Sequence, residues 1–599
     1  MAEEHATGPP EGVIVVDTLI VGAGLSGAYA FDQLCLYFSS LSSSSSPQNG
    51  DSSNDDGMGG NRPQKKLYRV ALMEARDRAG GRSCTIHKRI EHDNKETGDD
   101  DDDGEFSADN CYSVDVGGQW LGKTHQEMLS LCEAFGLEVE EQSFPPPATA
   151  ASSIAVVDAG ESSDNNAATN TASLMEIAYY PLKPLSDAAQ EEVKSFEIFL
   201  RDSYLQLDSL LRGDKTQNQN QPDNSNNWKH LEQEWDAISI YDMIQQKCTL
   251  PESQEQFVFF CQTCLAVDPR HCSFLFFLYY VFVWSGGGAH GMELLGDGPD
   301  SFQALKVKGG IQQISNELIR RALGTSLASS SAASSSSSGP AVDARVYYGC
   351  EIGSICHENK EEDADDDFDY VIVTSAAGDK VFHCCNVILA MSPTLFYKSM
   401  TFTPQLSNER ISLYESLVMG RAVKVIVAFQ KAFWKDATTT KEDPATVLSL
   451  SISEVGIVSN IFESNVGPYP ALVGLLTGDR ATTYHSTASK QARQELVLSQ
   501  LRIMYPNYSD PPVAFIEKDW LSEPHSGGCF AAIASASEAS VFANYKHLLH
   551  EAIIKDKVFL AGTESSTQFY GYLEGAVLAG KRAAAEVMAL ATHGDGAAC

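Results

Sequence analysis

Three glycines near the start of the chain stand at the spacing of a nucleotide-binding turn. Gly22, Gly24 and Gly27 form the pattern GxGxxG, directly after the apolar stretch 13–21 and before a helical pattern. In such a turn, the first glycine allows a tight bend, the second lets a pyrophosphate approach the main chain, and the third lets the helix pack closely on the strand. The free N–H groups at the start of the helix attract phosphate. The pattern therefore predicts a dinucleotide site.

An acidic residue that bonds the ribose hydroxyls is expected about 20 residues after such a turn, at the end of the second strand. Glu74 ends the strand pattern 68–74. It reaches the expected spacing once the Ser- and Asn-rich stretch 39–64 is set aside as an insertion. We therefore predict that Glu74 binds the ribose, the alternative being a structural glycine turn and an unrelated glutamate.

The segment EARDRAGGR, residues 74–82, extends this site. Arg76 and Arg82 can reach phosphates, and Gly81 permits close backbone approach. A fold that binds NAD does not need this extension. The segment therefore favours a different dinucleotide.

A lysine interrupts an apolar strand pattern in the second half of the chain. Lys424 lies in AVKVIVAF, residues 422–429. A buried ammonium group costs several kcal/mol or shifts its pKa, so a lysine in this setting needs a reason. We predict a functional lysine, with a surface-facing side chain at alternating strand positions as the alternative.

Alternating strand and helix patterns position these residues and predict an α/β fold. The predicted strands are 13–21, 68–74, 369–374, 386–390, 421–430 and 447–462, and the predicted helices are 125–136, 191–211, 240–247, 256–284 and 310–323. A further glycine-rich strand, turn and helix closes the chain at 557–589.

Composition excludes a generic nucleic-acid binder. The 599 residues carry 43 basic and 80 acidic side chains, a formal charge of −37, whereas nucleic-acid binding needs a basic face. Low-complexity stretches hold much of the acid, including the run Asp99–Asp103, and are interpreted as solvated surface insertions. These stretches are 39–64, 91–110, 146–174, 212–228, 325–343 and 357–367.

No targeting or membrane segment is evident. The N-terminus lacks a basic region followed by an apolar run, and the longest apolar run, 274–284, is shorter than the roughly 20 residues that span a bilayer. We expect a soluble, cytoplasmic protein without a membrane anchor, an organelle being left open. The pair Cys261 and Cys264 lacks a second pair at zinc-ribbon spacing, so we expect buried thiols and no metal site.

Several segments resemble the flavin amine oxidases, in particular the monoamine oxidases. They are EARDRAGGR (74–82), DVGGQWLG (115–122), KGGIQQI (308–314), LAMSPTL (389–395), GRAVKVIVAFQKAFW (420–434), DWLSEPHSGGCF (519–530) and AGTESSTQFYGYLEGAVLAGKRAA (561–584). They follow the order of that family and span nearly all of the chain outside the insertions.

The resemblance implies a Rossmann-type FAD-binding domain and an α+β substrate domain built from intervening segments. FAD-binding segments are expected at 13–130, 308–400 and 516–590, substrate-domain segments at 131–307 and 401–515, and flexible tails at 1–12 and 591–599.

In that family, the cysteine at the position of Cys529 bonds covalently to the flavin, and two aromatic residues flank the amine above it. The matching aromatic positions are Phe530 and Tyr572, although monoamine oxidases usually carry Tyr where Phe530 stands. This departure places substrate preference in doubt, not the reaction. The family lysine at Lys424 binds a water near the flavin and assists reoxidation, and Trp520 matches the aromatic beside the flavin. The alternatives are an unmodified buried Cys529 and ordinary core packing for the aromatic residues.

The remaining implied FAD contacts are Ser26, Gly118, Gln119, Trp120, Ile352, Glu564, Gly571 and Leu573. The substrate cavity is expected to include Thr263, Cys264 and Gln303. Glu293 lies where monoamine oxidases carry apolar side chains, so it is a candidate for binding a second amino group.

The resemblance implies an FAD-dependent oxidase that converts a primary or secondary amine to an imine and then an aldehyde, while O2 becomes hydrogen peroxide. Its partners would be a small amine and O2, with a homodimer left open. Alternatives are a polyamine or diamine oxidase, an L-amino-acid oxidase, which should place an Arg against the substrate carboxylate, and a non-enzymatic flavin-fold scaffold.

Overall fold

The computed structural model describes residues 12–41, 67–90, 111–142, 185–212, 227–295, 300–331, 342–357, 369–435, 456–505, 508 and 510–593. The predicted insertions therefore lie wholly or largely outside the described residues. One of them differs from its prediction, because helix α9 (Gln312–Ser331) continues into the stretch 325–343 and strand β8 (Val342–Tyr347) begins within it.

An eight-stranded sheet with a parallel centre carries the glycine turn. The parallel strands are β8, β2 (Tyr68–Met73), β1 (Val13–Val21), β11 (Val381–Leu389) and β19 (Val558–Leu560). Beyond β11, the sheet continues with β10 (Val371–Ser375), β9 (Ile352–Cys356) and β12 (Thr401–Thr403). The predicted strands 13–21, 68–74, 369–374 and 386–390 are thus confirmed within a few residues.

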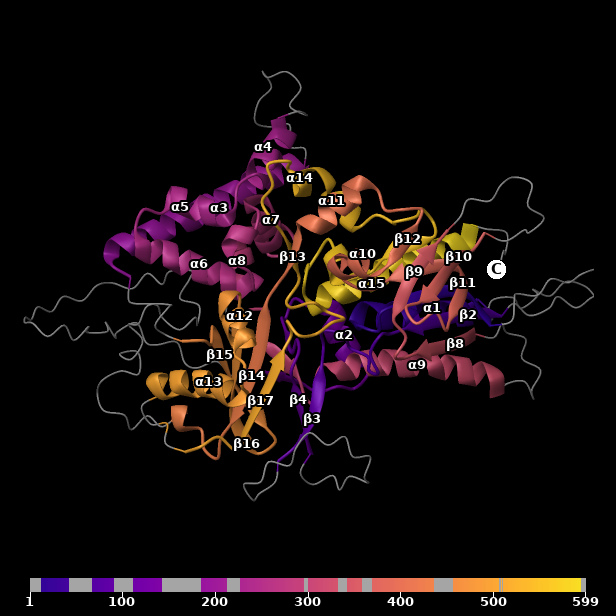
Figure 1. Cartoon of the computed structure of the whole chain (residues 1–599), viewed down its shortest axis with the longest axis horizontal. Coiled ribbons are helices and arrows are strands. Elements are labelled where there is room, and N and C mark those ends of the chain that lie inside the picture. Colours follow the sequence, from indigo (N-terminus) through magenta and orange to yellow (C-terminus); the bar gives the residue numbers. More distant parts are fainter. Residues whose placement is uncertain are drawn as a thin grey trace, which may run out of the picture.

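Strand β1 is mostly apolar, with Asp17 and Thr18 as its polar residues, because both faces of the sheet are covered. Leu19 and Val21 pack into one hydrophobic core, whereas Ile20 packs into another. The second core also contains helix α1 (Leu25–Ser40), which lies between α9 and α15 (Leu573–His593) beside the sheet (Figure 1). A parallel sheet covered by helices confirms the predicted α/β class.

A separate antiparallel sheet has the strand order β15 (Asn460–Val466), β16 (Tyr469–Thr477), β14 (Ala422–Ala428) and β17 (Ala514–Asp519). Val423 and Val425 face helices α12 (Asp479–Ser486) and α13 (Lys490–Met504). Because strand side chains alternate, Ala422 and Ile426 face the opposite core, which contains Trp520 and Cys529. This alternation directs Lys424 towards the same side as Cys529.

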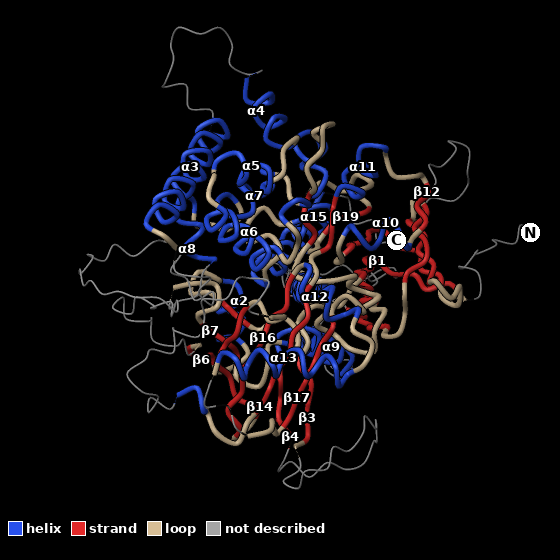
Figure 2. The backbone as a smooth tube through the Cα atoms, turned by 60° about the vertical axis from the view of Figure 1, so that its left-hand side comes forward, coloured by secondary structure: helices blue, strands red, loops and turns tan. Residues whose placement is uncertain are grey.

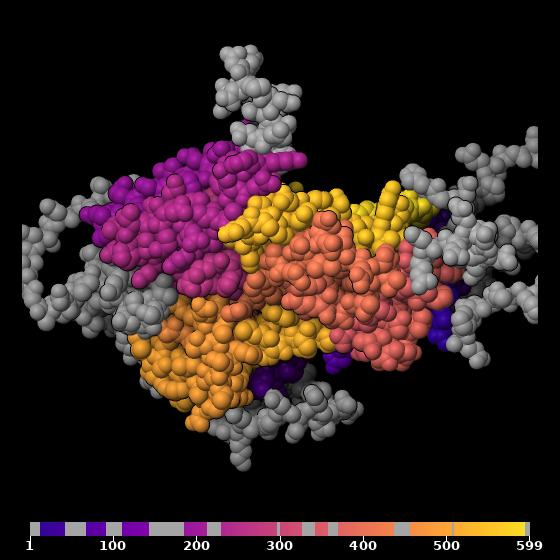
Figure 3. Space-filling view, turned by 45° about the horizontal axis from the view of Figure 1, so that its top comes forward, coloured from indigo at the N-terminus to yellow at the C-terminus, as the bar shows by residue number. Residues whose placement is uncertain are grey.

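A third part of the molecule is helical. This helical part comprises α3 (Asp187–Arg212), α4 (Asn227–Asp236), α5 (Ile240–Lys247), α6 (Pro251–Leu265), α7 (Phe274–Leu278) and α8 (Gly291–Leu295). Figure 2 shows these helices above the antiparallel sheet. Figure 3 shows the helical part, the segment from β15 to β17 and the large-sheet region packed against one another.

The single helix predicted for 256–284 is wrong. Helix α6 ends at Leu265 because Ala266 adopts a left-handed conformation, with φ of 57°. A short 3-10 turn at Pro269–His271 follows, and Ser273 then caps α7 through a hydrogen bond from the amide of Phe276. The predicted strand 447–462 is also displaced, since β15 begins at Asn460 and 447–455 lie outside the described residues.

Smaller elements complete the fold: β3 (Thr85–Arg89) with β4 (Cys111–Asp115), β5 (Trp120–Leu121) with β7 (Leu305–Val307) and β6 (Val139–Glu141), β13 (Leu417–Met419) with β18 (Ala532–Ala534), and helices α2 (Gln126–Ala134), α10 (Pro393–Ser399), α11 (Asn408–Ser416) and α14 (Val541–Tyr545). Among all helices in the described ranges, none combines the length and the apolar character needed to cross a membrane.

Candidate active site

A cavity of about 330 Å³ begins at the carboxyl end of β1 and reaches the helical part and the antiparallel sheet. Its position follows the rule that α/β sheets bind ligands beyond the carboxyl ends of their strands. Most of the residues singled out in the sequence line it: Gly22, Gly24, Ser26, Glu74, Arg76, Gly81, Arg82, Gly118, Gln119, Trp120, Thr263, Cys264, Gln303, Ile352, Lys424, Trp520, Cys529, Phe530, Gly571, Tyr572 and Leu573. Gly27, Glu293 and Glu564 do not.

The glycine turn forms one end of the cavity. Gly22 has a φ of 102°, in the region that favours glycine. A Cβ atom at Gly27 would overlap the carbonyl oxygen of Gly22, so Gly27 serves helix packing behind the cavity. Gly24 precedes α1 and has no side-chain cap, so the helix N-terminus can receive an anionic group.

Glu74 is buried beside this turn and ties it to the second strand. One carboxylate oxygen accepts the amide of Ala23 at 2.7 Å, and the other accepts the amide of Arg76 at 2.9 Å. The carboxylate lies on the cavity wall. These contacts fix its orientation and suit it to bind hydroxyl groups of a nucleotide.

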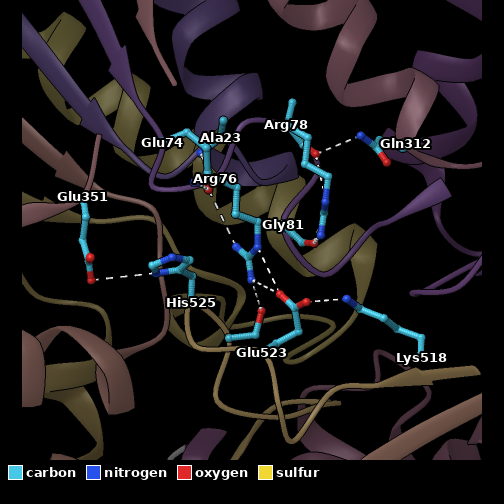
Figure 4. A network of polar contacts seen from close by, with 12 residues as sticks. Ala23, Glu74, Arg76, Arg78, Gly81, Gln312, Glu351, Lys518, Glu523 and His525 are labelled. Atoms are coloured by element: carbon cyan, nitrogen blue, oxygen red, sulfur yellow. Dashed lines mark hydrogen bonds and ion pairs between the residues drawn. The ribbon is translucent and has the colours of Figure 1, made fainter. Parts of the chain in front are cut away.

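Arg76 is paired to carboxylates within the protein (Figure 4). Its Nη2 atom lies 2.9 Å from Glu523 Oε2 and donates to Ser526 Oγ at 2.9 Å. Lys518 also pairs with Glu523, on its other oxygen. Arg76 was expected to bind phosphates, but its guanidinium already pairs with Glu523 and donates to Ser526.

Arg82 forms a two-pronged ion pair with Glu564, at 2.7 and 3.0 Å. Its Nη1 atom also donates to the carbonyl oxygen of Phe530 at 2.8 Å. Glu564 is fully buried, and it contacts Arg82 without lining the cavity. The pair joins three segments that are distant in the sequence, and it supports the loop that carries Cys529.

Cys529 lies in the cavity wall after two glycines. A Cβ atom at Gly528 would overlap the carbonyl oxygen of Gly420, so the chain can approach β13 there only with a glycine. The amide of Cys529 donates to that same carbonyl at 2.8 Å. Burial raises the pKa of Cys529 to about 12, although Arg82 opposes this. Cys529 therefore lines the cavity as a neutral thiol.

Lys424 is only 3% exposed, which excludes the surface-facing alternative. Its Nζ atom donates to the carbonyl oxygen of Gly117 at 2.9 Å and to the side-chain oxygen of Gln119. Burial lowers the pKa of Lys424 to about 8, and the nearby Asp115 carboxylate opposes this shift. An amine with this pKa can hold or release a proton near neutral pH.

Aromatic side chains form the far end of the cavity. The Tyr572 ring meets the edge of Phe302 at a centroid distance of 4.8 Å and lies 6.1 Å from the ring of Tyr280. Thr563 holds the backbone of this loop, since its hydroxyl donates to the carbonyl of Tyr572 at 2.9 Å. Trp520 donates to the carbonyl of Val116 at 3.0 Å beside Gly117.

The expected substrate residues separate into two groups. Thr263, Cys264 and Gln303 line the cavity, and Gln303 Oε1 is buried without a hydrogen-bond partner among the described residues. Glu293 does not line it, because it faces Arg201 of α3, with which it pairs at 3.3 Å. A role for Glu293 in binding a second amino group is therefore not supported.

Sequence reasoning missed several cavity residues. Tyr280 and Phe302 stand in or near apolar stretches, where nothing distinguishes a wall residue from a core residue. Asn460 and His525 also line the cavity. His525 lies in the segment 519–530 that carries the resemblance, but its side chain was not singled out there. Cys261 and Cys264 are buried thiols, as expected. In the described ranges, no group of three or more His, Cys, Asp or Glu side chains could hold a metal.

Comparisons with known proteins give a consistent assignment. Residues 64–588 match the family described as flavin containing amine oxidoreductase. Amine oxidase [flavin-containing] A of Sus scrofa is 24% identical over 522 residues, covering 87% of this chain and 80% of that protein. Amine oxidase [flavin-containing] B of Homo sapiens is 22% identical over 522 residues, covering 87% and 81%.

Two solved structures show the same fold. Wild-type putrescine oxidase bound to putrescine superposes with a TM-score of 0.62 at 18% identity, covering 96% of this chain and 100% of that one. Cyclohexylamine oxidase from Brevibacterium oxydans IH-35A has a TM-score of 0.63 at 21% identity, with the same coverage. The fold expected from the sequence is thereby confirmed.

Proposed function

The chain belongs to the flavin containing amine oxidoreductase family, and we propose that it oxidises monoamines with O2 as the electron acceptor. A primary or secondary amine becomes an imine, which water hydrolyses to an aldehyde, and O2 becomes hydrogen peroxide. The single observation that carries this proposal is the set of residues that line one cavity. The glycine turn with Gly22 and Gly24 lies at one end, and Lys424, Cys529, Phe530 and Tyr572 line the rest.

The cavity fits FAD by its donors and by its glycines. Glu74 presents a fixed carboxylate for the ribose, and the start of α1 offers uncapped N–H groups for the pyrophosphate. When bound, FAD supplies the two-electron acceptor for the reaction. We further propose that it is joined to Cys529 Sγ by a thioether, because Cys529 lines the cavity on a loop held by Arg82.

The chain's own residues orient the amine and exclude water. Phe530 and Tyr572 present aromatic faces that attract an ammonium group and align the lone pair of the neutral amine. Trp520 is 2% exposed and closes the wall beside Gly117. We assign Lys424 Nζ the role of holding a proton next to the reaction centre, because its pKa is about 8.

The charge of the lining favours monoamines over diamines. A second ammonium group would need a carboxylate at the aromatic end. Among the described residues, the acidic side chains that line the cavity are Glu74 and Glu351. Both belong to the nucleotide end, because Cys350, next to Glu351, donates its amide to the carbonyl of Glu74. An uncharged aryl or alkyl substituent on the amine fits this lining better.

Amino acids are also disfavoured as substrates. A substrate carboxylate would need a free guanidinium. The arginines that line the described part of the cavity are Arg76 and Arg82, and both are paired with glutamates. A scaffold role is disfavoured as well, because it would not require a buried Lys424 beside a buried thiol.

The test begins with the intact mass of the denatured, purified protein. We expect the mass of the chain plus one FAD less two hydrogens, because the C–S bond replaces one S–H and one C–H bond, with O2 as the oxidant. The C529S variant should lose this addition, while C350S, which changes another buried thiol of the same cavity, keeps it. An amine panel follows, with benzylamine, tyramine, putrescine, spermine and phenylalanine. We expect peroxide from the first two and much less from the others. A flavin-loaded protein that produces no peroxide from any amine would contradict the proposal.

A further inference from the structure

A buried histidine stands directly behind the aromatic end of the cavity. His125 precedes α2 and is fully buried. Its ring centroid lies 4.9 Å from that of Phe302 and 6.1 Å from that of Tyr572, both of which line the cavity. A third ring, Phe569, lies 5.1 Å away at an interplanar angle of 80°. His125 is therefore a common neighbour of Phe302 and Tyr572, two of the rings that shape this end of the cavity.

One hydrogen bond fixes the protonation of this imidazole. The amide of Gly122 donates to His125 Nδ1 at 3.0 Å. Because a backbone amide can only donate, Nδ1 is unprotonated and the ring proton lies on Nε2. Burial also lowers the pKa of His125 to about 3. The side chain is therefore a neutral imidazole with its N–H at a defined position.

Aromatic side chains surround the imidazole ring. His125 Nε2 is buried and has no hydrogen-bond partner among the described residues. The N–H edge of an imidazole is electropositive, and such an edge packs favourably against the electron-rich face of another ring. The rings next to this imidazole are those of Phe302, Phe569 and Tyr572.

Gly122 and Phe302 complete a connected unit. A Cβ atom at Gly122 would lie only 3.0 Å from a ring carbon of Phe302, so glycine permits this close packing. Phe302 in turn meets Tyr572 edge-on. The hydrogen bond from Gly122 thus sets the angle of His125, and His125 with Phe302 restricts the ring of Tyr572 from behind.

We propose that His125 is a positioning residue that fixes the ring of Tyr572 towards the amine, through ring contacts rather than through charge. This inference rests on the proposed function, because Tyr572 is there one of the two aromatic faces that orient the substrate. His125 touches neither substrate nor cofactor in this role. Its effect should appear in amine alignment, and therefore in turnover, more than in folding.

Two substitutions test separately the contribution of the His125 ring and that of its hydrogen bond with Gly122. H125F keeps a ring against Phe302 and Tyr572 but leaves the Gly122 amide without its acceptor. H125N keeps an acceptor near the position of Nδ1 but removes the ring. We expect H125F to melt at a lower temperature with kcat/KM for benzylamine within about threefold of wild type. We expect H125N to melt near the wild-type temperature with kcat/KM reduced about tenfold, mainly through kcat.

The exposed His230 of α4 provides a matched control, and H230N should change neither quantity. A binding measurement avoids turnover altogether: α,α-dimethylbenzylamine has no hydrogen on the reacting carbon, and calorimetry should show weaker binding to H125N than to H125F. A double-mutant cycle tests whether His125 acts through Tyr572. In a Tyr572→Leu background, H125N should reduce kcat/KM by less than about twofold.

The proposal is overturned if, in both H125F and H125N, the loss of kcat/KM parallels the loss in melting temperature. It is also overturned if H125N reduces kcat/KM by the same factor with and without the Tyr572 ring. If H125F does not fold, the cycle with H125N alone decides between these outcomes. A wild-type protein that neither binds nor oxidises any amine would instead overturn the proposed function, and with it this inference.

Discussion

Replacing Lys424 by methionine should stabilise the protein at neutral pH while slowing its reaction with oxygen. The folded pKa of Lys424 is about 8, against an ordinary value of 10.5. Below pH 8 the ammonium is charged in both the folded and the unfolded chain, and burying it costs about 3 kcal/mol, at 1.36 kcal/mol per pKa unit. Methionine removes this cost but also removes two hydrogen bonds, worth about 1 kcal/mol each. The net gain at pH 7 is about 1 kcal/mol.

The sign of this difference should reverse at alkaline pH. Between pH 8 and 10.5 the folded protein releases the lysine proton while the unfolded chain retains it, so the stability of the wild type rises with pH. At pH 9.5 the remaining cost is about 1 kcal/mol, less than the two lost hydrogen bonds. The variant should therefore melt higher than the wild type at pH 7 and lower at pH 9.5.

The assay is a thermal melt of both proteins across this range, in which the difference in melting temperature should swing by about 2–4 °C. K431M, at an exposed lysine, serves as the control and should show no such swing. Reoxidation of the amine-reduced K424M protein by O2, followed by stopped flow, should be at least about tenfold slower. A K424M protein that melts at a constant offset from wild type, or reoxidises at the normal rate, would refute the reasoning.

Three further outcomes follow from the structure. G27A places a Cβ atom against the carbonyl of Gly22, so it should yield protein with little bound flavin, measured by the ratio of absorbance at 450 and 280 nm. R82M leaves the buried Glu564 without its partner and should lower stability by about 3–5 kcal/mol, seen as a large drop in melting temperature; a drop of under 2 °C would show that the pair is not structurally important. Burial raises the pKa of Glu197 to about 7, so between pH 4.5 and 7 the folded protein keeps this proton while the unfolded chain loses it. The stability of the wild type therefore falls as pH rises through that window. The melting temperature of E197Q should gain relative to that of the wild type between pH 5 and 8, and a difference that stays the same across this range would contradict the pKa shift.

Local patterns located the residues at the glycine-turn end of the cavity. The bend at Gly22 and the strand end at Glu74 are properties of short segments, so their spacing could be read once the insertion 39–64 was set aside. The same holds for Lys424, because strand alternation decides which face it occupies. Apolar periodicity also located the strands of the large sheet.

Long-range pairing could not be read from the sequence. Arg76 and Arg82 were expected at phosphates, but their carboxylate partners, Glu523 and Glu564, lie more than 400 residues away. Whether Glu293 faced the cavity depended on a one-residue rotation of the short helix α8, which periodicity cannot fix over so few residues.

Other differences between the predicted and the observed structure had only weak signals in the sequence. Pro269 could have indicated the end of α6, because proline cannot continue a helix from its interior. His125 carried no signal, since a histidine before a helix is an ordinary feature. Its importance arises only from the packing of Phe302, Phe569 and Tyr572 around it.

Mixing the purified protein with benzylamine in the absence of oxygen tests the central claim most directly. The flavin absorbance near 450 nm should bleach fully in one exponential phase, and admitting O2 should restore it with one hydrogen peroxide per flavin. A protein that contains flavin, keeps its absorbance unchanged with every amine of the panel, and yet is reduced by dithionite would contradict the account.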